Sequence, residues 1–314
     1  MTNPAPSPTR VQYDLRPGKQ VERRMLLDGL QLLASAGFPI RQYRYLGMGA
    51  FYFVDYVLFH KFLGIDDLVS FEHEVTIRRR VQFNRPFACV RLRFEPIGEY
   101  FEKLTQRLPH IAWIDYDSVL AEVHLRDVVL AASRLAVGSV LLVTVDCEPP
   151  DGRNASPKRT HAYYTAEAGA YLRPGLRHSD FAAARLPELV ASTVENAIGH
   201  GVHGRDGLAF EPLFRFEYAD GHRMMTCGGM IVDNVAKRRL KASQFGAAVY
   251  SRLGRSGMFR IHVPKLTQRE RLYLEARMPA TSGWRPAGFE LGELDTEAYR
   301  GIYRFFPTYA ELFL

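Results

Sequence analysis

The sequence predicts an α/β protein built on a doubly wound, mostly parallel sheet. Short apolar runs alternate with helical patterns along residues 43–145, which is typical of successive strand–helix units. The run Ser139–Val145 is almost continuously apolar, as in a strand that is buried on both faces. Farther along, Ala219-Asp-Gly-His222 separates two strand-like runs, and an Asp-Gly turn favours a hairpin. We therefore expect a seven-stranded sheet that ends in an antiparallel pair.

Amino-acid composition limits the class of protein that this chain can be. The 314 residues are 47% hydrophobic and 24% charged, which is ordinary for a globular protein with a full core. The three cysteines are far apart and form no metal-binding or redox spacing, so we expect reduced thiols and a cytoplasmic location. No apolar run is long enough for a membrane span. The net charge of +7 permits a polyanionic partner without requiring one.

We expect four regions along the chain. Residues 1–15 are rich in Pro, Ser and Thr and should form a disordered tail. Residues 16–40 should hold an N-terminal helix, predicted over Val21–Ala36. Charged residues at its start (Arg16, Lys19, Glu22, Arg23 and Arg24) form either a solvated face or a cap over a ligand site. The α/β domain should span 41–235, and a basic and aromatic extension over 236–314 should pack on it.

The first unit of the α/β domain is the most informative stretch. It reads as a strand over Tyr43–Leu46, a turn at Gly47-Met48-Gly49, a helix over Ala50–Leu63 and a strand over Leu68–Phe71. Glu72 follows, 25 residues after Gly47, close to the roughly 20 residues expected in a nucleotide-binding unit. In such a unit a ligand approaches the small residues of the turn, and the carboxylate accepts hydrogen bonds from ribose hydroxyls.

The remaining elements follow in order. Predicted helices cover Thr76–Phe83, Gly98–Leu108, Leu120–Ala136 and Arg185–Ile198. Predicted strands cover Phe87–Phe94, Ile111–Asp117, Ser139–Val145, Leu213–Tyr218 and Met224–Val232. The polar stretch 148–162 should be a lid or substrate loop, 199–207 a flexible loop, and Gly228-Gly229 a bulge.

This order of elements resembles a class I S-adenosylmethionine-dependent methyltransferase, with a Rossmann-like fold. The resemblance covers residues 41–235 and rests on topology and motif position. It implies S-adenosylmethionine as cofactor and methyl transfer, with O-methylation one option, to an unidentified acceptor. The glycine motif falls on Leu46–Phe51, where Phe51 occupies the place of a third small residue.

The resemblance also implies site residues. Cofactor-binding positions would be Gly47, Met48, Gly49, Glu72, Phe94 and Asp115, and the catalytic or acceptor-positioning residues would be Asp117 and Asp115. No Asn-Pro-Pro-Tyr tetrapeptide follows the fourth strand, which disfavours methylation of an exocyclic base amine by that signature.

More than one chemical role is possible for Asp115 and Asp117. Strand alternation puts Asp115 and Asp117 on one face, where either could take a proton from a hydroxyl acceptor or orient it. With Asp146 and Glu148 at the next strand tip they could instead bind Mg²⁺, an alternative that we favour less. A third interpretation is that all of them cap helices and loops.

The C-terminal region suggests partners. The run Lys237-Arg-Arg-Leu-Lys241, with Tyr250, Phe259 and Tyr273 farther on, could track a phosphate backbone. The last residues, YRFFPTYAELFL, are apolar enough to need a core, a protein partner or a second copy of the chain to cover them. The alternative to an enzyme is therefore a non-catalytic cofactor- or nucleic-acid-binding module that acts in a complex.

Overall fold

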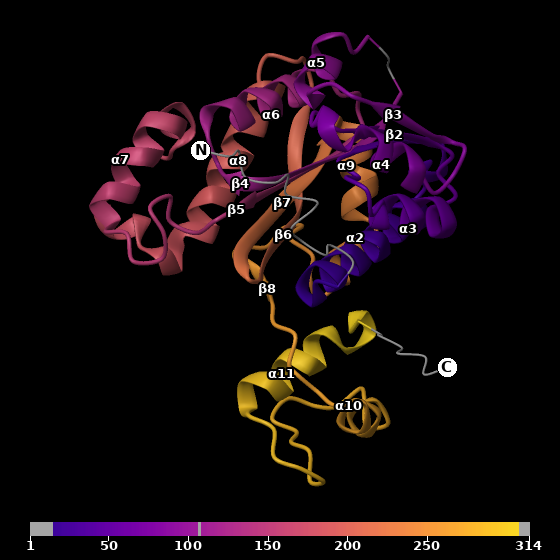
Figure 1. Ribbon diagram of the computed structural model, residues 1–314, viewed down its shortest axis with the longest axis vertical. Coiled ribbons are helices and arrows are strands. Elements are labelled where there is room, and N and C mark those ends of the chain that lie inside the picture. Colours follow the sequence, from indigo (N-terminus) through magenta and orange to yellow (C-terminus); the bar gives the residue numbers. More distant parts are fainter. Residues whose placement is uncertain (1–14, 106–107, 308–314) are drawn as a thin grey trace.

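The computed structural model describes residues 15–105 and 108–307, and its centre is a single sheet with helices on both faces (Figure 1). The tail predicted to be disordered lies outside the described residues except for Leu15. The last seven residues of the apolar C-terminus also lie outside them.

Eight strands form the sheet of the described chain, in the order β3-β2-β1-β4-β5-β7-β6-β8. All of them run parallel except β7, which is antiparallel to both of its neighbours. Their bounds are β1 (Arg44–Gly47), β2 (Asp67–Phe71), β3 (Val90–Arg93), β4 (His110–Val119), β5 (Val140–Asp146), β6 (Ala209–Asp220), β7 (His222–Val232) and β8 (Phe259–Ile261).

Helices cover both faces of this sheet. In chain order the α-helices of the described chain are α2 (Pro17–Ser35), α3 (Val54–Leu63), α4 (Arg78–Asn84), α5 (Ile97–Glu102), α6 (Glu122–Arg134), α7 (Pro157–Ala168), α8 (Leu186–Val202), α9 (Asn234–Lys241), α10 (Gln268–Glu275) and α11 (Glu293–Ile302), the last two of which lie away from the sheet. Two cores result, because alternate residues of each strand point to opposite faces. In β5, Leu142 packs in the core beneath α2 and α3, while Leu141 packs in the core beneath α6 and α8.

The predicted fold class is confirmed, and so is the closing hairpin, whose strands meet at Gly221 with φ +103°. The predicted number of seven strands was too low, because the short β8 adds to the outer edge beside β6. The predicted bulge is present, but it lies on β6 between Pro212 and Phe214, opposite the glycine pair. A Cβ on Gly228 would collide with the Leu141 carbonyl oxygen, which explains the glycine there.

The start of α2 is fixed at the carboxyl edge of the sheet. Asp220 ends β6, and its two carboxylate oxygens accept hydrogen bonds from the Gly18 and Lys19 N–H groups, each at 2.9 Å. A carboxylate at a helix N-terminus binds its unpaired N–H groups and favours the helix dipole. Because β6 runs parallel to β1–β5, this contact brings the charged first turn of α2 to the edge where those strands also end.

Several predicted helix bounds were wrong for local reasons. The helix predicted from Ala50 begins only at Val54, because Ala50 and Phe53 have φ values of 45° and 50° and cannot continue a right-handed helix. The stretch 199–207, predicted as a loop, begins inside α8, which runs to Val202. Part of the predicted loop 148–162 is helical, since Ser156 caps the start of α7.

The C-terminal helices α10 and α11 form a small lobe below the sheet in Figure 1, connected to it through β8. Two contacts join the end of this lobe to the main body. The Arg24 side chain donates to the Phe306 carbonyl at 2.6 Å, and the rings of Tyr250 and Phe305 meet edge to face at 5.8 Å. Across residues 15–105 and 108–307, no helix has the length and apolar character of a membrane span.

Two glycines of α8 should respond in opposite ways to alanine. Gly201 lies against α6, where a Cβ would come within 2.7 Å of the Ala132 Cβ and closer still to the Val129 carbonyl. Gly201→Ala should therefore lower the free energy of unfolding by about 1–3 kcal/mol through overpacking. Gly199 has open space around its Cα, so Gly199→Ala is the matched control. It should be neutral or stabilise by up to about 1 kcal/mol, because alanine is the better helix residue. Denaturant unfolding of both variants tests this pair, and equal effects would contradict the packing of α8 on α6.

Candidate functional site

A cavity of about 450 Å³ opens at the carboxyl edge of the sheet, which is where parallel α/β sheets bind their ligands. Its walls come from the glycine turn after β1, the ends of β2 and β4, the segment after β3, the first turn of α2 and the hairpin. The lining residues are Arg16, Lys19, Arg23, Met48, Gly49, Ala50, Tyr52, Phe53, Val54, Asp55, Phe71, Glu72, His73, Glu74, Glu95, Pro96, Ile97, Asp115, Tyr116, Asp117, Asp127, Tyr218 and Met224.

The glycine turn is packed tightly against Ser70 of β2 and against the Phe53 ring. The Gly49 N–H donates to the Ser70 hydroxyl at 3.2 Å, and a Cβ on Gly49 would lie 2.7 Å from the Phe53 ring. Phe51 does not line the cavity. Its ring is buried under the Arg80 guanidinium, whose Cζ is 3.9 Å from the ring centroid. The bulky residue in the glycine motif therefore leaves the cavity open.

Glu72 follows β2 and faces the cavity. Its Oε1 accepts a hydrogen bond from the Glu74 N–H at 2.9 Å, which fixes the carboxylate. Burial raises the pKa of Glu72 above its usual value, and the Glu74 N–H opposes that shift. The carboxylate can accept hydrogen bonds from hydroxyl groups of a ligand in the cavity.

Some of the predicted site residues line the cavity and others do not. Met48, Gly49, Glu72, Asp115 and Asp117 line the cavity together. Gly47 and Phe94 are not among its lining residues.

The neighbours of those two residues explain their positions. A Cβ on Gly47 would collide with the Tyr45 hydroxyl, so this glycine serves packing beneath the turn. The Phe94 ring lies 4.4 Å from the Arg78 guanidinium, and Glu95, Pro96 and Ile97 take its predicted place in the wall.

The tip of β4 brings Asp115, Tyr116 and Asp117 to the cavity, where its pairing with β5 becomes irregular. Tyr116 lies on the face opposite Asp115, as expected, because it packs against the core beneath α6 whereas Asp115 pairs with Lys19 of α2. The Tyr116 hydroxyl donates to Asp127 on α6 at 2.7 Å, which adds a further carboxylate to the wall.

A buried ion cluster joins α2 to the tip of β4. The Lys19 ammonium lies 2.8 Å from Asp115 Oδ2 and 3.0 Å from Glu22 Oε2. Lys19 and Glu22 are 2% and 0% exposed, whereas Asp115 is 26% exposed at the cavity. The Lys19 ammonium also lies 4.5 Å from the Trp113 ring centroid. Burial raises the pKa of Glu22, and the charge of Lys19 opposes the shift.

Buried hydrogen bonds lie in the sheet beside this cluster. Trp113 donates to the Thr144 hydroxyl at 2.9 Å, and the Thr144 and Thr226 hydroxyls are 2.6 Å apart. These groups come from β4, β5 and β7, and their hydrogen bonds hold the three strands in one arrangement.

Asp55 forms a second buried acidic contact beside the turn. It accepts a hydrogen bond from the Tyr45 hydroxyl. Burial raises the pKa of Asp55, and the charge of Arg23 on α2 opposes the shift. The first two turns of α2 thus meet both the glycine-turn side and the β4 side of the cavity. Of the two interpretations of its charged residues, the structure supports the cap over a ligand site.

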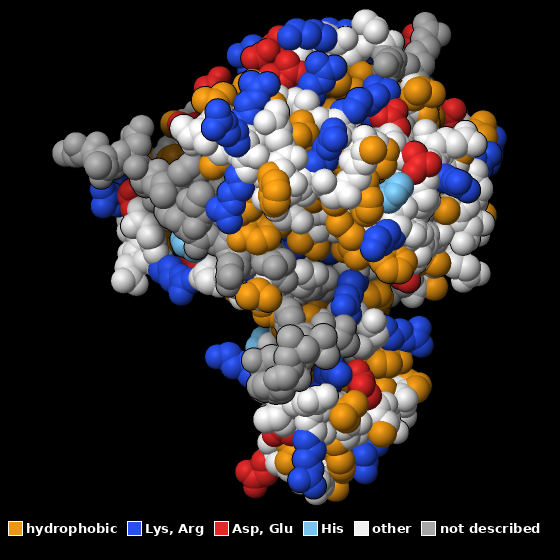
Figure 2. All heavy atoms as spheres, turned by 45° about the vertical axis from the view of Figure 1, so that its right-hand side comes forward, with side chains coloured by type: hydrophobic (Ala, Val, Ile, Leu, Met, Phe, Trp, Pro, Cys, Tyr) orange, Lys and Arg blue, Asp and Glu red, His pale blue; other side chains and the backbone are white. Residues whose placement is uncertain are grey.

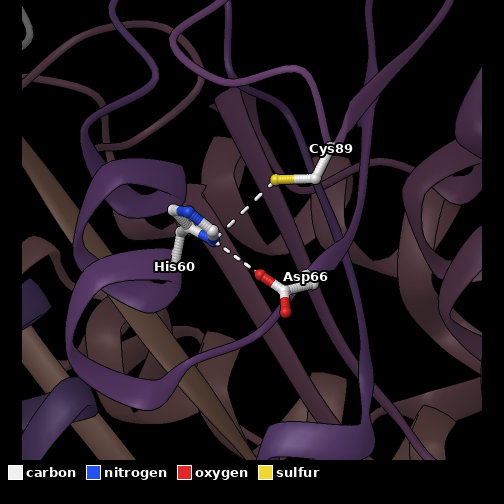
Figure 3. Close-up of side chains that lie close together, drawn as sticks. All are labelled: His60, Asp66 and Cys89. Carbon is white, nitrogen blue, oxygen red and sulfur yellow. Dashed lines mark hydrogen bonds and ion pairs between the residues drawn. The ribbon is translucent and has the colours of Figure 1, made fainter.

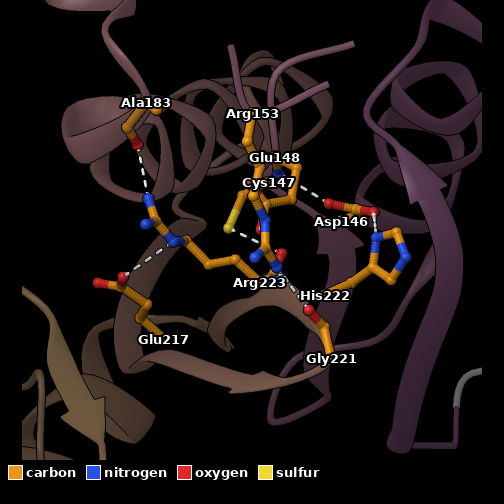
Figure 4. Close-up of polar contacts among 9 residues, drawn as sticks. All are labelled: Asp146, Cys147, Glu148, Arg153, Ala183, Glu217, Gly221, His222 and Arg223. Atoms are coloured by element: carbon orange, nitrogen blue, oxygen red, sulfur yellow. Dashed lines mark hydrogen bonds and ion pairs between the residues drawn. The ribbon is translucent and has the colours of Figure 1, made fainter. Parts of the chain in front are cut away.

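Asp146 and Glu148 form polar contacts away from the cavity (Figure 4). They were the other two acids of the possible Mg²⁺ site with Asp115 and Asp117. Asp146 lies 3.0 Å from His222 Nδ1, and Glu148 accepts from Arg153 at 3.0 Å and from the Arg223 N–H at 3.3 Å. Neither residue lines the cavity, and nor does any other residue of the predicted lid 148–162. In the described part of the chain these four carboxylates form no group with metal-ligand spacing.

The basic residues after Ala236 are largely engaged within the chain. Lys237 pairs with Glu211, Arg239 donates to the Gly37 carbonyl at 3.1 Å, and Arg260 donates to Glu217 at 2.9 Å. On the face shown in Figure 2, lysine and arginine side chains are scattered among hydrophobic and uncharged ones. The phosphate-tracking stripe stays a prediction.

The charge of the cavity favours a cationic ligand. Seven carboxylates line it, against three arginine and lysine side chains from the start of α2. A low-dielectric cleft with an excess of one sign attracts the opposite sign. Apolar side chains such as Phe71 and Ile97 supply a surface for a flat ring.

This sheet, with its glycine turn and following acid, defines a class I S-adenosylmethionine-dependent methyltransferase, and S-adenosylmethionine is its cofactor. The profile of a family described as "Putative O-methyltransferase" matches residues 11–314, and the chain belongs to that family. The search of curated proteins gave no match.

Two solved structures are among those similar to part of this chain. Trm1 from Pyrococcus horikoshii, in complex with S-adenosyl-L-methionine, is 13% identical at a TM-score of 0.46, with 77% of this chain and 61% of that chain covered. NodS from Bradyrhizobium japonicum WM9, an N-methyltransferase in complex with S-adenosyl-L-homocysteine, is 11% identical at a TM-score of 0.39, with 69% and 89% covered.

The pKa of Glu22 gives the stability a defined pH dependence. Folding raises this pKa above the ordinary 4.5, so the contribution of Glu22 to stability is complete below pH 4.5 and is lost as pH rises through the raised pKa. Glu22→Gln removes this titration. The thermal midpoint of the variant minus that of the wild type should therefore increase with pH across that window and then level off.

The exposed Glu290 provides the control for the chemical change alone, and Glu290→Gln should leave the thermal midpoint close to that of the wild type. A difference for Glu22→Gln that stays constant with pH would show that Glu22 is not buried beside Lys19. Calorimetric scans at closely spaced pH values measure both variants.

Proposed function

We propose that this protein transfers a methyl group from S-adenosylmethionine to an oxygen atom of an acceptor that binds beside the tip of β4. The single observation that carries the proposal is the Lys19–Asp115 pair, which brings a carboxylate fixed by a buried cation into the same cavity as Glu72 and the glycine turn. The description of the family supports oxygen as the accepting atom.

The cavity residues fit the cofactor. Glu72 would accept hydrogen bonds from ribose hydroxyls, Phe71 and Ile97 would contact the adenine ring, and the turn at Gly49 would let the ligand approach the backbone. The cations at the start of α2 would hold a carboxylate, while the surplus of cavity carboxylates favours positive groups. When bound, the cofactor supplies an activated methyl group for in-line displacement.

The chain's own part in the reaction is to orient the acceptor and take its proton. In this proposal a hydroxyl acceptor donates its proton to Asp115 Oδ1, while Lys19 holds Oδ2 at 2.8 Å. Asp117, which is exposed two residues farther on, would orient the acceptor at the mouth of the cavity. Buried groups around Lys19 keep the carboxylate in place, so it need not reorganise during transfer.

We also infer a cytoplasmic location. All three cysteines are free, and Cys147 and Cys227 are buried with no disulfide partner, which is the usual state in a reducing compartment.

Cofactor binding tests the first part of the proposal. Glu72→Ala should weaken S-adenosylhomocysteine binding by roughly 10- to 100-fold, the value of one or two charge-assisted hydrogen bonds. Isothermal calorimetry measures this loss. The exposed Glu290→Ala is the control and should bind as wild type does. No detectable binding by wild type would overturn the proposal.

Turnover tests the role of the β4 tip. Radiolabelled methyl transfer should be followed from S-adenosylmethionine to small-molecule, RNA, DNA and protein fractions, with mass spectrometry to identify the methylated atom. Asp115→Asn should lower kcat by about 10²-fold or more while S-adenosylhomocysteine affinity changes little. Asp117→Asn should mainly raise KM.

The outcomes of this assay are distinct. Loss of kcat in Asp117→Asn alone would move the proton acceptor to Asp117. Methylation of nitrogen would contradict O-methyl transfer. Binding of cofactor without transfer to any fraction would favour the non-catalytic module.

A further inference from the structure

A second cluster of reactive side chains lies away from the cavity (Figure 3). His60 belongs to the last turn of α3, Asp66 immediately precedes β2, and Cys89 immediately precedes β3. These are the amino ends of the strands, whereas the cavity is at their carboxyl ends. Asp66 and Glu72 stand at opposite ends of β2, on the order of 20 Å apart along an extended strand.

The three side chains converge on one point. The His60 Nδ1 atom is 3.2 Å from Asp66 Oδ1 and 3.8 Å from Cys89 Sγ, and the three ligand atoms all lie within 4.8 Å of one another. In the described part of the chain this is the one group of histidine, cysteine and acidic residues with that spacing. The Phe87 ring, 4.3 Å from that of His60, supports the imidazole from one side.

These separations match a tetrahedral zinc site. Zinc bonds of about 2.3 Å to sulfur and about 2.0–2.1 Å to nitrogen and oxygen place neighbouring ligand atoms roughly 3.3–3.6 Å apart. The observed 3.2 and 3.8 Å lie near those values before any adjustment. A thiolate, an imidazole and a carboxylate together suit zinc better than magnesium or calcium, which prefer oxygen ligands only.

Hydrogen bonding does not account for the convergence. His60 Nδ1 also lies 2.9 Å from the Ile65 carbonyl, and one N–H group can donate well to only one acceptor. The Ile65 contact satisfies the imidazole alone. It leaves the approach of both a thiol and a carboxylate to the same nitrogen without a structural reason.

We propose that His60, Asp66 and Cys89 bind one zinc ion, with water as the fourth ligand. On binding, the Cys89 thiol releases its proton to solvent and its thiolate bonds to the metal. The His60 Nδ1 atom gives up its proton to solvent while Nε2 takes one from solvent, which breaks the hydrogen bond to the Ile65 carbonyl, and the freed Nδ1 lone pair bonds to the metal. Asp66 is 69% exposed, so the metal and its water can enter from solvent.

The zinc ion would crosslink the chain at one edge of the sheet. β3 is an edge strand, and its start would be tied through the metal to the end of α3 and to the start of β2. These elements come from three separate stretches of the chain. A metal that crosslinks them stabilises the folded state by an amount that grows with its free concentration.

Cobalt and zinc titrations test this site on the full-length chain. Wild type should bind one equivalent of Co²⁺ with a near-ultraviolet sulfur-to-cobalt charge-transfer band, and Zn²⁺ should displace it. Cys89→Ser should remove the band and weaken Zn²⁺ binding by at least about 100-fold, since loss of an outer-shell partner alone costs 10- to 100-fold. Zn²⁺ should raise the thermal midpoint of wild type and not that of Cys89→Ser.

Matched variants make the result specific. Cys147→Ser changes a buried thiol that donates to the Arg223 carbonyl, and it should retain the cobalt band. Asp66→Asn changes a largely exposed side chain, so it should fold and still bind Zn²⁺ at least about tenfold more weakly. Glu72→Ala should bind zinc normally, which separates this site from the cofactor cavity. Absence of the band in wild type, or undiminished zinc affinity in Cys89→Ser, would overturn the proposal.

Discussion

The arrangement of the cavity depends on one buried cation. Lys19 pairs with Glu22 on its own helix and with Asp115 at the tip of β4, and it lies over the Trp113 ring. Burying one ammonium beside two carboxylates is costly unless each group keeps its partners. Removal of Lys19 would leave the buried Glu22 carboxylate without its cation, beside the partly exposed Asp115. α2 is therefore held against the sheet by charge as well as by apolar packing, and the cavity has a rigid wall.

That wall completes a site whose other parts are common to parallel α/β sheets. The glycine turn and Glu72 lie where successive β/α units place them, at the carboxyl ends of β1 and β2. The distinctive parts come from outside this repeat, from the first turn of α2 and from the β6–β7 hairpin. The tip of β4, where we propose that methyl transfer occurs, is thus contacted by residues far from it in sequence.

The difference between local and distant interactions explains what the sequence could predict. The strand–helix alternation, the hairpin and the unit from Gly47 to Glu72 follow from local patterns, and the structure confirms the fold. The Lys19–Asp115 contact joins residues that share no local signal. The Phe51 ring, in the turn before α3, packs under the Arg80 guanidinium of α4 and stays out of the cavity. Phe94, predicted to bind the cofactor, lies outside the cavity, whereas the next residue, Glu95, lines it. The strand β8 was missing from the predicted sheet because it has only three residues. Each of these features depends on contacts between distant parts of the chain, which residue spacing in the sequence does not reveal.

The cap on α2 has a consequence for the order of folding. The N–H groups of Gly18 and Lys19 bond to Asp220, about 200 residues later. During synthesis the first helix is made long before the strand that caps it, so its docking must wait until β6 exists. The ligand cavity is consequently one of the last features of the molecule to form. Truncation before β6 would leave α2 without the carboxylate that fixes its first turn.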